Sequence, residues 1–175
     1  MNWTIEEAME FAEIVFGSTT QLIESQSREV APMSLILHEH PEQPGNLVWS
    51  PVIPDPEMFD SEEGKNDFAD QVRSASMELG GDFVFLLTEC WVKESTENPS
   101  RLVEQYGSVE AIPGRQEALM LKVDGLGGFS ATIRGIITDE GGQRRVAKPV
   151  TSRTDQGGSV HSDRFSDLSG RQLDN

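Results

Sequence analysis

The sequence predicts an α+β protein, with a mostly antiparallel sheet of about five or six strands and two helices packed on one face. Two segments have the apolar spacing of amphipathic helices, six segments resemble short strands, and the two kinds do not alternate regularly. The 175 residues are enough for one domain with a substantial core. We expect this domain to span residues 1–150. Residues 151–175 are polar with few large apolar side chains, which predicts a disordered C-terminal tail.

The first predicted helix starts at Thr4. Thr4 and Glu7 have the spacing of a capping box, in which each side chain accepts a hydrogen bond from a backbone amide. The apolar residues keep the spacing of one helix face: Ile5, Ala8, Met9, Ala12, Val15, Phe16, Leu22 and Ile23. Three acidic residues fall on the opposite face: Glu6, Glu10 and Glu13. We therefore expect an amphipathic helix with an acidic outer stripe.

Two short strands should follow this helix. Residues 33–38 form an apolar run, and a turn with two prolines separates it from a second run at residues 46–53. Pro51 has no amide donor, which limits the second run to the edge of the sheet. Trp49 lies on this edge strand. We select it as a candidate partner contact, with partial burial under a loop as the alternative.

The second predicted helix begins at Asp60 or Ser61, either of which can cap it, and ends at Gly80-Gly81. One apolar stripe follows helical spacing: Phe68, Val72, Ala75 and Leu79. The early turns are acidic, where the helix dipole favours negative charge: Glu62, Glu63, Asp67 and Asp70. These carboxylates form the second acidic helix surface of the chain.

The strongest strand signal lies at residues 82–92, where both sets of alternating side chains are apolar. A strand of this kind is buried on both faces and is usually central. A polar stretch with a helical turn at residues 100–106 leads to a hairpin around the glycine-rich turn 125–128. The hairpin strands and the last strand are predicted at three places: 117–124, 129–138 and 143–150.

A longer pattern runs from Gly80-Gly81 through the strand Thr88-Glu89-Cys90-Trp91 and a polar loop to the apolar strand after Gly114-Arg115. In this pattern the chain resembles a loosely defined set of uncharacterised small bacterial and phage proteins that have a Ser/Thr-Glu-x-Trp strand. The resemblance covers about residues 65–140. It implies the order helix, strand, loop, hairpin and a microbial or viral accessory protein. It implies no activity and assigns no site residues.

The charge of the chain is strongly asymmetric. There are 30 acidic and 14 basic residues, which gives a formal net charge of −16, and the excess of acids lies in residues 1–110. Such a surface repels phosphate, so direct binding to nucleic acid and attraction to anionic membranes are both disfavoured. A small basic cluster lies further on: Arg144, Arg145 and Lys148. We expect it to pair with the acidic helices or with the acids of another copy.

The residues offer little support for catalysis. His38 and His40 fall on one face of a strand and are typical metal ligands, but no third ligand is evident. Cys90 lies in a buried strand beside Glu89, where a thiolate is disfavoured, and is best explained as a core cysteine. We therefore expect no catalytic residue, no metal site and no cofactor.

Our leading hypothesis is a non-enzymatic acidic protein that binds a basic macromolecule, as an inhibitor or a nucleic-acid mimic, because carboxylates spaced along helices resemble a row of phosphates. The candidate partner-binding residues combine both helix surfaces with the edge tryptophan: Glu6, Glu10, Glu13, Trp49, Glu62, Glu63, Asp67 and Asp70. One alternative is a small metal-dependent enzyme that uses His38, His40 and nearby acids. Another is a structural subunit of a virion or other assembly.

The sequence also favours a cytoplasmic location. Cys90 is the only cysteine, so no intrachain disulfide can form. The first residues are acidic where a secretory signal would be basic, and no apolar segment follows them. The longest apolar run is far shorter than the roughly 20 residues that span a bilayer. We therefore expect no membrane association.

Overall fold

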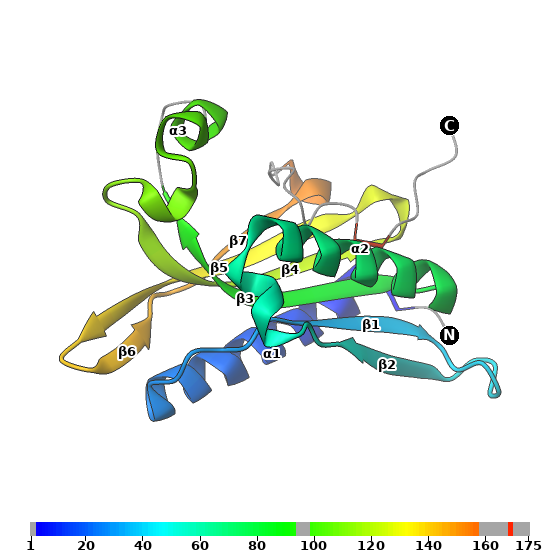
Figure 1. Cartoon of the computed structure of the whole chain (residues 1–175). Helices are drawn as coiled ribbons and strands as arrows, with labels where there is room; N and C mark the ends of the chain where they lie inside the picture. The colour runs from blue at the N-terminus through cyan, green and yellow to red at the C-terminus, as the bar shows by residue number, and fades with distance from the viewer. Residues whose placement is uncertain (1–2, 94–98, 158–167, 170–175) are drawn as a thin grey trace.

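The protein is α+β, as predicted. The computed structural model describes residues 3–93, 99–157 and 168–169 (Figure 1). The helices are α1 (Ile5–Gln26), η1 (Pro56–Asp60), α2 (Glu62–Leu79), α3 (Pro99–Tyr106), η2 (Val109–Ala111), η3 (Leu126–Gly128) and η4 (Thr154–Gln156). The strands are β1 (Met33–Glu39), β2 (Leu47–Val52), β3 (Phe83–Val92), β4 (Gln116–Gly125), β5 (Ser130–Glu140), β6 (Gln143–Val146) and β7 (Val150–Arg153). Figure 1 shows α3 standing away from the sheet, between β3 and β4 in the chain.

All strands belong to one antiparallel sheet in the order β2-β1-β3-β4-β5. The outer edge of β5 pairs with two short strands, β6 near Ile137–Glu140 and β7 near Ala131–Arg134. β3 lies inside the sheet, where Leu86 is in register with Ser34 on one side and Lys122 on the other. The predicted central position of β3 and the edge position of β2 are both confirmed.

The two long helices pack on opposite faces of the sheet. Phe83, Phe85 and Leu87 of β3 belong to the core under α1, whereas Val84 and Leu86 belong to the core under α2. Figure 1 shows the helices on the two sides of the sheet. Our expectation that both helices share one face is therefore wrong. The physical reason lies in β3: successive side chains point to opposite faces and both sets are apolar, so each face needs a covering helix.

Trp49 lies within an aromatic cluster under α1. Its ring stacks on Phe11, with 4.3 Å between ring centroids, and meets Trp3 and Phe85 edge to face at 5.2 and 5.3 Å. Contacts of this kind contribute about 0.5–1.5 kcal/mol beyond area burial. The half-buried Trp49 thus packs the edge strand β2 against α1. Its predicted role as a partner contact gains no support from this position.

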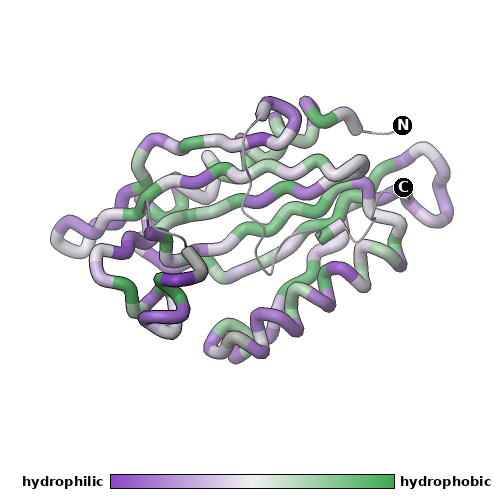
Figure 2. Tube along the Cα trace, turned by 90° about the horizontal axis from the view of Figure 1, so that it is seen from above, coloured by the Kyte–Doolittle hydropathy of each residue, from purple (hydrophilic) through white to green (hydrophobic). Residues whose placement is uncertain are grey.

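The local signals predicted for α2 are present. The Ser61 hydroxyl accepts a hydrogen bond from the Gly64 amide at 3.0 Å, and Gly80 ends the helix with a left-handed φ of 67°. Phe68 and Val72 are fully buried against the sheet. Figure 2 shows hydrophilic and hydrophobic stretches alternating along α2, as expected of a helix with one buried side. Among the described segments, no helix has the length and apolar content needed to cross a membrane.

The folded structure continues beyond residue 150. β7 pairs with β5, and Leu168 is completely buried in the core under α2. The predicted boundary between the domain and a disordered tail is therefore wrong for β7 and for Leu168–Ser169. A four-residue strand and a single leucine carry no periodic signal, which explains the error. The rest of the predicted tail, residues 158–167 and 170–175, lies outside the described residues.

Candidate functional site: an acidic cavity beside α2

A shallow, widely open depression of about 320 Å³, called the cavity below, lies between η1 and the first turns of α2. Its lining residues are Asp55, Glu57, Met58, Ser61, Glu63, Gly64 and Asp67. Four of these are carboxylates, two from the η1 segment and two from α2. We call Asp55, Glu57, Glu63 and Asp67 the acidic patch.

The local sequence brings η1 and α2 together. Pro56 starts η1, where its missing amide and fixed φ are tolerated. Ser61 ends η1 and caps α2. Gly64 allows the close approach of the two helices, because a Cβ there would overlap the carbonyl oxygen and Cα of Met58. The carboxylates of both elements consequently line a single cavity.

The acidic patch is a concentration of exposed negative charge. All four side chains are exposed. In the described part of the chain, none of the four side chains forms an ion pair. The positive end of the α2 dipole offsets only part of this charge. The patch is therefore suited to attract cationic groups from outside the chain.

Two other acids predicted on α2 differ from the patch. Asp70 forms an i,i+3 ion pair with Arg73 at 2.7 Å, which reduces the charge available to a partner. Glu62 begins α2, but its side chain lies outside the described part of the structure. Of the four acids predicted on this helix, Glu63 and Asp67 line the cavity. Asp55 and Glu57, which complete the patch, were absent from the predicted site.

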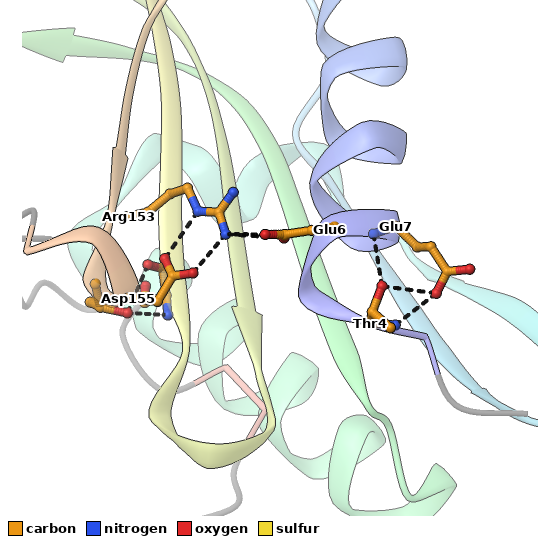
Figure 3. Close-up of polar contacts among 7 residues, drawn as sticks. Thr4, Glu6, Glu7, Arg153 and Asp155 are labelled. Carbon is orange, nitrogen blue, oxygen red and sulfur yellow. Dashed lines mark hydrogen bonds and ion pairs between the residues drawn. The ribbon is translucent and has the colours of Figure 1, made fainter.

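The acids of α1 form a separate surface, because α1 covers the other face of the sheet. Glu6 pairs with Arg153 of β7 at 3.1 Å, and Figure 3 shows this contact linking α1 to the sheet edge. Glu10 and Glu13 are exposed. The predicted acidic residues therefore do not form one surface. The sheet separates the α1 acids from the acidic patch.

Hydrogen bonds near Glu6 shift the pKa values of neighbouring groups (Figure 3). The Glu7 carboxylate accepts from the Thr4 amide at 2.8 Å and from its hydroxyl at 3.0 Å, and these bonds lower the pKa of Glu7. This completes the predicted capping box. The guanidinium of Arg153 donates to Asp155 at 2.6 Å, which lowers the pKa of Asp155 and raises that of Arg153. These groups stabilise α1 and the β7 region.

A second charged cluster, which sequence analysis missed, is nearly buried at the β6 end of the sheet. Arg144 donates to Glu89 at 2.8 and 3.1 Å, to Glu117 at 2.7 Å and to the Arg28 carbonyl at 2.9 Å. Glu89 also accepts from the Val30 amide at 2.8 Å. Desolvation raises the pKa of Glu117, although Arg144 opposes that shift. The hydrogen bond to Glu89 raises the pKa of Arg144.

This cluster joins four segments that are distant in sequence: β3, β4, β6 and the chain that links α1 to β1. Because its charges are opposed and engaged with one another, it is a structural link and not an accessible binding surface. Two features of the sequence bear on this cluster: Glu89 is a charged residue within an apolar strand, and Arg144 belongs to the basic cluster noted above. Arg144 thus pairs with strand carboxylates, and not with the acidic helices as we expected.

The two described histidines, His38 and His40, give no support to a metal centre. His38 is buried, with its Nδ1 2.9 Å from the Glu39 carbonyl and its Nε2 2.8 Å from the Ser50 hydroxyl. His40 Nδ1 accepts from the Glu42 amide at 3.1 Å. Across residues 3–93, 99–157 and 168–169, no group of three or more His, Cys, Asp or Glu side chains is placed to hold a metal ion.

No protein-family model, curated protein or solved structure matches this chain.

Proposed function

We propose that this protein is a non-enzymatic binding protein that recognises a basic macromolecule through the acidic patch. The observation that carries the proposal is the cavity between η1 and α2. Four exposed carboxylates line it, and none of them forms an ion pair with another residue that the structure describes. A lysine or arginine side chain placed over this depression would lie beside carboxylates of both η1 and α2. A guanidinium group suits such a site, because its planar fork can bond two carboxylates at once.

The electrostatics favour rapid and salt-sensitive association. Each exposed ion pair contributes only about 0.2–1 kcal/mol, so the four patch residues together supply roughly 1–4 kcal/mol. The net charge of −16 adds long-range attraction, which steers a basic partner toward the protein. At physiological salt the Debye length is about 8 Å, and attraction over longer distances is largely screened.

The chemistry of the patch indicates the class of partner. A protein whose basic groove normally holds nucleic acid presents rows of lysine and arginine, and acids that occupy such a groove inhibit it. The proposal therefore includes the roles of inhibitor and nucleic-acid mimic. It also includes a cytoplasmic location, which the single cysteine, Cys90, supports. The acids Glu10 and Glu13 lie outside the proposed binding surface.

Affinity capture from the native host tests the proposal when three baits are compared. The patch variant carries Asp55→Asn, Glu57→Gln, Glu63→Gln and Asp67→Asn. The control variant carries Glu10→Gln, Glu13→Gln, Glu104→Gln and Glu110→Gln, which removes the same charge from exposed positions elsewhere. We expect the wild type and the control to capture the same basic protein at about 50 mM salt and to release it toward about 200 mM. Equal capture by the patch variant would contradict the proposal.

A further inference from the structure

The side chain of Leu168 is enclosed between α2 and the sheet. It has no exposed surface and lies in one cluster with six residues of the body: Ile36, Phe68, Ala69, Val72, Val84 and Leu86. Two hydrogen bonds hold the backbone of Leu168 and Ser169. The Leu168 amide donates to Asp124 Oδ2 at 3.0 Å, and the Ser76 hydroxyl donates to the Ser169 carbonyl at 3.2 Å. We call these apolar side chains, together with Asp124 and Ser76, the Leu168 site.

The polar groups of the Leu168 site are themselves buried and positioned by the body of the protein. Ser76 is completely buried and Asp124 is 3% exposed. Asp124 Oδ1 accepts from the Ser130 hydroxyl at 2.6 Å, which orients the carboxylate. Ser76 is packed against Gly81, where a Cβ would lie 2.8 Å from its hydroxyl oxygen and 2.7 Å from Ile36 Cγ2. The site is therefore largely formed by α2 and the sheet.

The described contacts recognise only generic features of a peptide. They comprise one branched apolar side chain, the amide of that residue and the carbonyl of the next. Residues 168–169 lie in a turn, and any peptide that places a leucine-like residue in such a turn presents these three features. No described contact requires the bound segment to be covalently connected to this chain.

We propose that the Leu168 site is a peptide-binding site that the protein's own C-terminal segment occupies in cis, and that the same segment binds there in trans when the cis segment is prevented from docking. Tethering gives the cis segment an effective concentration in the millimolar range, so it excludes a free peptide at micromolar concentration. This inference is independent of the acidic patch, since it uses other residues and a different ligand chemistry.

The test uses full-length protein and a fluorescent peptide with the sequence of residues 160–175. Leu168→Asp in the protein should empty the site, because an unpaired carboxylate is not buried in an apolar cluster. We expect this variant to bind the peptide at least about tenfold more tightly than the wild type does, given the loss of cis competition. A peptide that itself carries Leu168→Asp is the control and should bind neither protein. If the variant is folded but does not bind the wild-type peptide, the proposal is overturned.

If Leu168→Asp prevents folding, a second measurement tests whether the segment around residue 168 can leave the site. In a Cys90→Ser background, Leu168→Cys and Leu86→Cys each place one thiol in the same apolar cluster. We expect a thiol reagent to label position 168 at least about 100-fold faster than position 86, because the segment can leave while the core stays folded. Wild-type peptide added at millimolar concentration, which matches the effective concentration of the cis segment, should accelerate labelling at position 168 only. Equal rates at both positions, with no effect of peptide, would overturn the proposal.

Discussion

Replacement of Arg144 by methionine should destabilise the protein strongly, because it would leave a nearly buried carboxylate without its charged partner. The Glu89 side chain is 10% exposed and receives two hydrogen bonds from Arg144, and Glu117 receives a third. Removal of one partner from a buried ion pair typically costs about 3–5 kcal/mol. Total stabilities are commonly about 5–15 kcal/mol, so this loss is a large fraction.

The prediction is measured by urea and thermal unfolding of Arg144→Met. For a chain of this size, about 2–4 °C per kcal/mol gives a decrease in Tm of roughly 6–20 °C. Arg145→Met is the matched control, since Arg145 is exposed on the same strand, and should change stability by less than about 0.5 kcal/mol. Adding Glu89→Gln to Arg144→Met should restore part of the loss by removing the isolated charge. A loss below about 1 kcal/mol for Arg144→Met would refute the assignment of a structural role to this cluster.

Four further predictions concern other contacts. Glu117 has a raised pKa in the folded state, so the folded protein binds this proton more tightly than the unfolded chain does. The stability of wild type should therefore rise relative to that of Glu117→Gln as pH falls from 7 through the raised pKa. If the stabilities of the two proteins change in parallel with pH, the prediction is wrong. Thr4→Ala should cost about 1 kcal/mol in thermal unfolding through loss of the cap. Wild type should be more stable than Glu7→Gln at pH values above the ordinary pKa of a glutamate. This difference in stability should disappear as pH falls through the lowered pKa of Glu7. A difference that does not depend on pH would exclude the Glu7 carboxylate as its source. Gly81→Ala should cost about 1–3 kcal/mol, because its Cβ would crowd Ile36 and Ser76, and an unchanged Tm would show that the site relaxes freely.

Local features of the fold were largely predictable from the sequence. The capping box at Thr4 and the left-handed Gly80 are both confirmed, because they depend on residues within one or two helical turns. The double-faced apolar pattern of β3 predicted its central position. The same pattern already required cover on both faces. Placing the two helices together therefore contradicted a signal present in the sequence.

Features that depend on long-range pairing were not predictable. Arg144 meets Glu89 across 55 positions of sequence, and only the sheet register brings them together. Leu168 is an isolated apolar residue among polar neighbours, so neither periodicity nor composition distinguishes it from a solvated tail residue. Because we expected both helices on one face of the sheet, we expected their acids on one side of the molecule. The sheet separates these acids because the helices lie on opposite faces, and the number of charges along the sequence does not reveal this placement.

The most direct test of the central claim is the salt dependence of binding to a fluorescent octa-arginine peptide. The dissociation constants of wild type, the patch variant and the control variant should be compared between about 50 and about 200 mM salt, after circular dichroism has shown that all three are folded. We predict that the patch variant binds at least about fivefold more weakly at low salt and has a smaller salt slope, as expected for the loss of roughly 1–4 kcal/mol of ion pairing. The control variant should stay close to wild type. Equal weakening of both variants would show that only net charge matters, and would contradict a binding surface at Asp55, Glu57, Glu63 and Asp67.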